Sequence, residues 1–251
     1  MSLPLATKSW GAGGRRLLLL HGISSNADGW WRVAPRLVEA GFEVVAPDLR
    51  GHGGSARADS YLLTEHAEDV LALGGGWEVA VGHSMGGAVA ALASSLDPGW
   101  AKGLVLYDPA LALPEPRDDE LEWLLEPYRR PATAEAMVEA NPSWHPEDCR
   151  IKAEAVAVSD ADMVRATVEG NRPWNVVEET AALQVPAVIL GSDPAAGGIM
   201  PVTLGEWLAS QGLTYRFMPG AEHSPHRDAA GFEGFMGHLT ESIAFLPTLG
   251  R

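Results

Sequence analysis

The chain has 251 residues and a formal net charge of −15, from 18 basic and 33 acidic residues. This excess of negative charge would repel a phosphate backbone, which argues against a nucleic-acid partner. Cys149 is the single cysteine, so an intrachain disulfide and a zinc site built from several cysteines are both excluded.

The length suits one domain with an insertion rather than two independent units. The first residues lack a basic segment followed by a long apolar run, and the longest apolar stretches have the length of strands. We therefore expect a cytoplasmic protein with no membrane partner.

The first part of the chain alternates between expected strands and helices. Residues 15–20 end in four leucines, which predicts a central parallel strand buried on both faces. Residues 30–41 have helical spacing and end in glycine, and residues 42–47 return as a strand. A helix at 62–73 then leads into a strand that begins at Trp77.

A turn with two glycines and a serine follows that strand. The apolar run 79–81 stops at Gly82, and after His83-Ser84-Met85-Gly86 the chain resumes as an alanine-rich helix. A sharp turn that exposes a serine leaves little room for Cβ atoms two residues on either side of it. Ser84 is therefore a candidate nucleophile between a strand and a helix.

A helical stretch interrupts the strands in the second part of the chain. A strand at 103–109 carries Asp108, and from residue 111 to 182 the composition shifts to glutamate, proline, tryptophan and helical alanine patterns. His223 lies in a loop before the last helix. The remaining predicted elements are strands at 185–194 and 214–219 and helices at 204–211 and 232–245.

These motifs resemble, in identity and in order, those of the α/β-hydrolase superfamily. Gly82-x-Ser84-x-Gly86 is similar to its nucleophile elbow, His21-Gly22 to the start of its oxyanion loop, and Asp48-x-x-Gly51-x-Gly53-x-Ser55 to a turn that follows the next strand. The resemblance implies an α/β fold with a mostly parallel central sheet flanked by helices. It also implies a small helical cap inserted after the sixth strand, with the catalytic core at 1–110 and 183–251 and the cap at 111–182.

The resemblance also assigns roles to individual residues. Ser84 is the nucleophile, and His223 matches the base that accepts the serine proton, with Glu222 in place of the usual preceding glycine. The backbone N–H groups of Ile23 and Met85 correspond to the two donors of the oxyanion hole.

The carboxylate that orients His223 has two candidates. Most serine hydrolases of the superfamily place it after the seventh strand, three residues beyond a glycine. Counted from Gly191, that position is Pro194, and Asp193 lies one residue early. Asp108 ends the sixth strand, which is the other known location, and it follows Ser84 by 24 residues. We favour Asp108 and keep Asp193 as the alternative.

Caps of this superfamily usually supply the apolar wall over the serine. We therefore predict substrate contacts from aromatic residues of 111–182, with packing inside the cap as the alternative for each one. These residues are Trp123, Tyr128, Trp144 and Trp174, with Met137 and His145 as further candidates.

A serine nucleophile attacks acyl carbon, whereas an aspartate nucleophile would attack alkyl carbon. The sequence therefore predicts a serine hydrolase, a carboxylesterase or lactonase, that cleaves a small-molecule ester or lactone through an acyl-enzyme. We expect no cofactor and no metal, and a monomer or homodimer. C–C bond hydrolases, thioesterases and cofactor-free haloperoxidases share these motifs, and a non-hydrolytic ligand-binding receptor is the alternative of another class.

Overall fold

A seven-stranded sheet forms the centre of the computed structural model, which describes residues 2–125, 128–129, 132–159 and 161–249. The strands are β1 Thr7–Trp10, β2 Arg15–Leu20, β3 Phe42–Pro47, β4 Val79–His83, β5 Leu104–Tyr107, β6 Ala187–Gly191 and β7 Thr214–Phe217. They lie in the order β1-β3-β2-β4-β5-β6-β7. The edge strand β1 is antiparallel to β3 and the other pairs are parallel, which confirms the predicted sheet.

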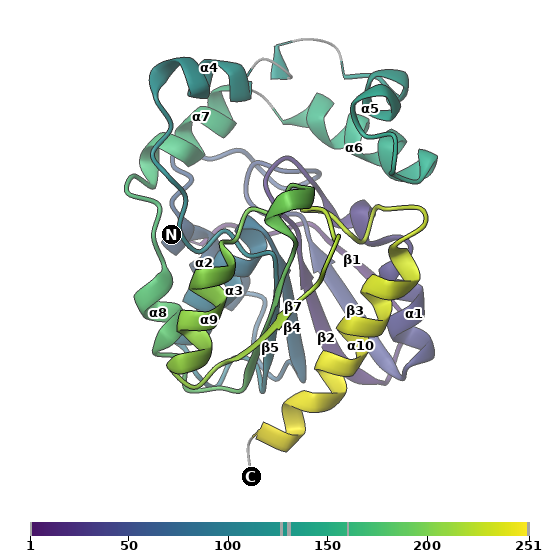
Figure 1. Cartoon of the computed structure of the whole chain (residues 1–251), viewed down its shortest axis with the longest axis vertical. Helices are drawn as coiled ribbons and strands as arrows, with labels where there is room; N and C mark the ends of the chain where they lie inside the picture. The colour runs from purple at the N-terminus through teal and green to yellow at the C-terminus, as the bar shows by residue number, and fades with distance from the viewer. Residues whose placement is uncertain (1, 126–127, 130–131, 160, 250–251) are drawn as a thin grey trace.

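Helices cover both faces of this sheet (Figure 1). They are α1 Val33–Glu39, α2 Leu63–Leu71, α3 Met85–Leu96, α8 Val177–Ala181, α9 Val202–Ser210 and α10 Phe232–Leu249. Leu18 and Leu20 pack with α2, α3, α8 and α9, whereas Leu17 and Leu19 pack with α1 and α10. Successive side chains of a strand point to opposite faces of the sheet, and helices cover both faces, so all four leucines are fully buried. A strand covered on both faces therefore needs a continuous apolar run.

Four further helices lie over one edge of the sheet (Figure 1). We call them the overlying helices: α4 Asp118–Leu125, α5 Ala134–Ala140, α6 Pro146–Val158 and α7 Ala161–Gly170. They follow β5, which is the fifth strand of this chain. The predicted position is after the sixth strand in the superfamily count, and the described chain has one strand fewer before this point. The division into a core and a cap at 111–182 stays a prediction, and α8 lies within that range although it packs against α3.

The overlying helices cover the edge at which the parallel strands end. Trp144 forms an isolated bridge with Asp228, and His145 N donates to Arg227 O at 2.8 Å. These contacts hold the loop between β7 and α10 against the link between α5 and α6. None of the helices in the described ranges is long and apolar enough to cross a lipid bilayer.

Candidate active site

Ser84 lies between β4 and α3 in a strained backbone conformation. Its φ is +53° and its ψ is −122°, and residues with a Cβ rarely occupy positive φ. The surrounding glycines allow the strand and the helix to approach. A Cβ on Gly87 would lie 2.6 Å from Pro109 Cβ, and one on Gly82 or Gly86 would overlap a backbone oxygen. This close packing holds Ser84 at the tip of the turn.

Asp108 holds the ring of His223. His223 Nδ1 lies 2.6 Å from Asp108 Oδ2, and Asp108 is fully buried directly after β5. The backbone N–H groups of Ile199 and Met200 donate to Oδ2 and Oδ1 at 2.9 and 3.2 Å. These donors fix the carboxylate. A proton donated from Nδ1 to Asp108 leaves His223 Nε2 as a proton acceptor.

Asp193, the alternative acid, belongs to a different hydrogen-bond network. Its side chain accepts hydrogen bonds from Ala195 N and Gly220 N, both at 2.9 Å. It therefore joins the turn after β6 to the start of the loop that carries His223. Of the two candidate acids, Asp108 is the one that the structure brings to His223.

Ser84 and His223 line one cavity of about 360 Å³. Among the described residues, no hydrogen bond joins Ser84 Oγ to the His223 ring, and such bonds are often long before substrate binds. Gly22 lies against the nucleophile, because a Cβ there would be 3.0 Å from Ser84 Cβ and 3.4 Å from its Oγ. Glycine at this position keeps the space beside the serine open.

The N–H groups of Ile23 and Met85 have no acceptor within the described ranges. Met85 is the first residue of α3, where an N–H has no partner inside the helix. Ile23 follows Gly22 in the loop after β2, and it lines the cavity. Both amides are therefore available to an oxyanion formed at Ser84.

His21 supports the loop that carries Ile23. Its Nδ1 donates to Gly22 O at 2.8 Å, and its Nε2 accepts from Leu49 N at 3.0 Å. Burial lowers the pKa of His21 to about 4, so the ring stays neutral and keeps both bonds. His52, in the turn that follows β3, packs against His21 with ring centroids 5.1 Å apart.

His83 fixes the backbone of the candidate base. Its Nε2 donates to His223 O at 2.8 Å, and its ring stacks on Tyr107 with centroids 4.5 Å apart. Burial lowers the pKa of His83 well below its ordinary value, so the ring is neutral. The sequence did not single out His83, because the position between the glycine and the serine of the motif has no required identity.

Two of the predicted wall residues from 111–182 line the cavity. They are Tyr128, whose hydroxyl lies 2.6 Å from Ser24 Oγ, and Trp144. His145 instead caps α6 by accepting from Glu147 N at 3.1 Å, and Met137 does not line the cavity.

The structure corrects the prediction for Trp174. This residue packs with the core, and its indole N–H donates to Ala110 O at 2.7 Å. It lines a separate apolar hollow instead of the cavity at Ser84. The side chain of Trp123, another predicted wall residue, lies outside the described part of the structure.

Two cationic residues that the sequence did not single out also line the cavity. Lys152 of α6 donates from Nζ to Ser24 O at 2.7 Å. Arg227 donates to Ser25 Oγ at 2.9 Å and to Asp148 O at 3.3 Å. From the sequence alone, neither residue can be distinguished from a charged residue on the solvent-exposed surface.

Backbone strain would also have gone unseen in the sequence. Ser24, Ser84 and Asp108 are the non-glycine residues with positive φ within the described ranges. Ser84 and Asp108 belong to the candidate catalytic set, and Ser24 bonds to Tyr128 and Lys152. The strain is therefore concentrated at this site.

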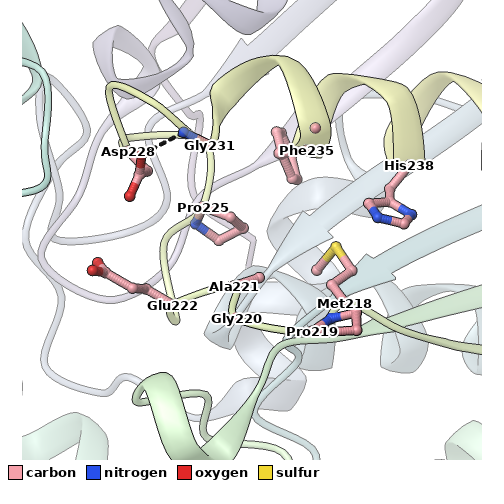
Figure 2. Close-up of a pocket in the computed structure, with 11 residues that line it drawn as sticks. Met218, Pro219, Gly220, Ala221, Glu222, Pro225, Asp228, Gly231, Phe235 and His238 are labelled. Atoms are coloured by element: carbon pink, nitrogen blue, oxygen red, sulfur yellow. Dashed lines mark hydrogen bonds between the residues drawn. The ribbon is translucent and has the colours of Figure 1, made fainter.

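A second hollow, of about 220 Å³, is lined by residues of the loop that carries His223 and of α10. Figure 2 shows Glu222 and Asp228 at one end of it and Met218 and His238 at the other. Ser84 and His223 do not line it, and Glu222 lines both spaces. The chemistry of Ser84 therefore belongs to the larger cavity.

Neither a metal cluster nor a reactive cysteine is found in the described part of the chain. No group of three or more His, Cys, Asp or Glu side chains there could hold a metal ion. Cys149 is buried, and burial raises the pKa of its thiol, which disfavours the nucleophilic thiolate.

Comparison with known proteins identifies the family. The family model described as "Alpha/beta hydrolase family" matches residues 17–234, and the chain belongs to this family. Lipase LipV of Mycobacterium tuberculosis is 38% identical over 144 residues, which cover 54% of this chain and 54% of the lipase. The pimeloyl-[acyl-carrier protein] methyl ester esterase of Edwardsiella ictaluri is 39% identical over 95 residues, which cover 38% of this chain and 36% of the esterase. The chain thus spans about half of the lipase and about a third of the esterase.

Solved structures resemble the whole chain. The N-formylmaleamic acid deformylase from Pseudomonas putida S16 has a TM-score of 0.79 and 26% sequence identity, over 93% of this chain and 94% of the deformylase. Est816, described as an N-acyl homoserine lactone degrading enzyme, has a TM-score of 0.73 and 19% identity, over 94% of this chain and 96% of that protein. At that identity, the second likeness shows the fold alone.

Proposed function

We propose that this protein is a serine hydrolase that cleaves carboxylic esters or lactones through an acyl-enzyme. The observation that carries the proposal is the 2.6 Å bond between His223 Nδ1 and Asp108 Oδ2, at a cavity that Ser84 also lines. The curated relatives support an ester bond as the target, since one is named a lipase and the other a methyl ester esterase. The overlying helices serve as the cap of this site.

In the acylation step, Ser84 takes the acyl group of the substrate and His223 transfers the proton. Ser84 Oγ attacks the carbonyl carbon while its proton passes to His223 Nε2, and Asp108 stabilises the imidazolium that forms. The carbonyl oxygen becomes an oxyanion, which accepts hydrogen bonds from the N–H groups of Ile23 and Met85. The bond to the leaving oxygen then breaks, and that oxygen takes the proton from Nε2.

Deacylation repeats these steps with water as the nucleophile. His223 Nε2 takes a proton from water as the water oxygen attacks the acyl carbon, and the same two amides hold the second oxyanion. The bond to Ser84 Oγ breaks, and the serine regains its proton from His223. The net reaction consumes one ester and one water and yields an acid and an alcohol.

Hydrolysis of a paired substrate panel tests this proposal. The panel contains p-nitrophenyl acetate and butyrate beside γ-butyrolactone and acyl-homoserine lactones, with kcat/KM as the readout. We expect Ser84→Ala to lower the activity by roughly 10⁴-fold or more, because the variant lacks the attacking oxygen. Activity that persists in a folded Ser84→Ala protein would remove Ser84 as the nucleophile.

The same panel separates the substrate classes. Lactones that react faster than esters of similar size would indicate a cavity shaped for a cyclic acyl group, and the enzyme would be a lactonase. Slow turnover of activated esters alone would favour a C–C bond hydrolase or a thioesterase. No turnover of any member would favour a ligand-binding receptor with the same fold.

A further inference from the structure

The cavity at Ser84 carries positive charge in a strongly acidic protein. Lys152 and Arg227, two of the chain's 18 basic residues, both line it. Lys152 comes from α6 among the overlying helices, whereas Arg227 comes from the loop that carries His223. The fold therefore brings together two cations that are far apart in the sequence.

Neither cation has an ion-pair partner among the residues that the structure describes. Lys152 Nζ donates to the backbone oxygen of Ser24, which leaves it with two further N–H donors. Arg227 is 3% exposed, and it donates hydrogen bonds to two uncharged oxygens, Ser25 Oγ and Asp148 O. Burial and the nearby Arg227 lower the pKa of Lys152 to about 7. A counter-ion in the cavity would relieve this unfavourable arrangement.

Two acidic groups nearby offset part of this positive charge. Glu222 lines the same cavity but accepts a hydrogen bond from Ser143 Oγ at 2.9 Å. Asp148 is buried and lies 3.6 Å from the Nη1 atom of Arg32, a third cation. Three cations thus face two carboxylates, and the wall beside the nucleophile keeps a net positive charge when Lys152 is protonated, below about pH 7.

We infer that Lys152 and Arg227 form a subsite for a carboxylate group of the substrate, so that the enzyme prefers anionic esters to neutral ones. This inference rests on the proposed function, because it assigns the charge of that function's substrate. A carboxylate matches the donors that are present. Lys152 has two N–H groups left, and the guanidinium of Arg227 uses only some of its N–H groups in hydrogen bonds to Ser25 Oγ and Asp148 O. A phosphate monoester has three oxygens and a higher charge, and would need more donors.

Lys152 has a competing role that the test must separate. It bonds to Ser24 O, next to Ile23, whose N–H we assign to the oxyanion hole. A lysine that only positions this loop would affect every ester alike. A lysine that binds a carboxylate affects the esters that carry one.

Matched pairs of esters distinguish these roles. Monomethyl succinate, glutarate and adipate are compared with methyl butanoate, pentanoate and hexanoate, and methanol release gives kcat and KM. A second set compares acetoxyacetate and 3-acetoxypropionate with ethyl and propyl acetate, which covers a carboxylate on the alcohol side. The variants are Lys152→Met and the control Arg150→Met, which removes a charge from the exposed face of the same helix, where Arg150 pairs with Glu147 and Glu154.

We expect the wild-type enzyme to hydrolyse at least one anionic ester with a kcat/KM at least 10-fold above that of its neutral partner. Lys152→Met should lower that value by roughly 10- to 100-fold, mainly through KM, as expected for the loss of a charge-assisted hydrogen bond. Neutral esters should lose at least 10-fold less than anionic ones, because only the contact to Ser24 O affects both classes, and Arg150→Met should leave both classes unchanged. Equal losses on neutral and anionic esters, or no anionic preference in either set, would overturn the inference.

Binding of glutarate provides a readout that does not depend on turnover. Calorimetry on Ser84→Ala should show glutarate binding and no binding of the uncharged glutaramide, and adding Lys152→Met should weaken the glutarate affinity at least 10-fold. If no ester of any kind is hydrolysed but glutarate still binds in this way, the proposed function fails and the subsite stands. If esters are hydrolysed and glutarate does not bind, the subsite fails alone.

Discussion

Replacement of Asp108 by asparagine tests the assignment of the triad acid. Both oxygens of Asp108 face fixed donors: Oδ2 faces Ile199 N and His223 Nδ1, and Oδ1 faces Met200 N. An amide must therefore turn its NH₂ group toward a donor in either orientation. If the NH₂ faces His223, the ring carries its proton on Nε2 and cannot accept one from Ser84.

We expect Asp108→Asn to lower kcat strongly and the free energy of unfolding moderately. The wrong tautomer should lower kcat by roughly 10⁴-fold, as the same change does in serine proteases. The buried N–H left without an acceptor should lower the free energy of unfolding by about 1–3 kcal/mol, which is a fall of several degrees in Tm. Initial rates with p-nitrophenyl butyrate and a thermal melt measure the two effects.

Asp193→Asn is the matched control for this experiment. It keeps the Asp108 and His223 pair intact and removes one charge from a turn, so kcat should stay within about 10-fold of wild type. The reasoning is refuted if Asp108→Asn retains more than a tenth of the wild-type kcat, or if Asp193→Asn shows the greater loss.

Three further changes should have distinct effects. Gly22→Ala places a Cβ 3.0 Å from Ser84 Cβ, so kcat should fall at least 10-fold with Tm nearly unchanged; an unchanged kcat would contradict the close approach. The ratio of kcat/KM for monomethyl glutarate to that for methyl pentanoate should be highest at pH 6 and decline above pH 7, because the pKa of Lys152 is about 7 and the charged fraction of the amine falls as the pH rises through that value. The ratio removes pH effects that both esters share, so a ratio that is flat from pH 6 to 9 would argue against a charged Lys152. Arg50→Met leaves the buried Asp69 carboxylate without its partner and should cost about 3–5 kcal/mol of unfolding free energy, seen as a Tm lower by roughly 10 °C; a shift below 2 °C would contradict it.

The parts of the fold set by local patterns could be predicted from the sequence. The continuous leucine run of β2 predicts a strand buried on both faces. The glycine-serine-glycine spacing after β4 predicts a sharp turn, because such a turn leaves no room for Cβ atoms at the glycine positions. Strand β1, Thr7–Trp10, carries no such signal, because its first three residues are polar and exposed. Its pairing with β3 makes it a strand, and that pairing is a long-range contact.

The parts of the site set by tertiary contacts could not be predicted. Spacing favoured Asp108 over Asp193 only weakly, and the difference between them lies in the distant Ile199 and Met200 amides that hold Asp108. Trp144 and Trp174 look alike in the sequence, yet one lines the cavity and the other packs in the core. Side-chain direction in a helical insertion depends on how its helices dock, which a single sequence does not reveal.

The central claim is that Ser84 forms a covalent acyl-enzyme. Its most direct test is mass spectrometry of the protein after treatment with a fluorophosphonate, followed by peptide mapping. The account predicts one adduct on the peptide that contains Ser84, and none in a folded Ser84→Ala variant. An adduct at another residue, or ester hydrolysis that continues after Ser84 has been fully modified, would contradict it.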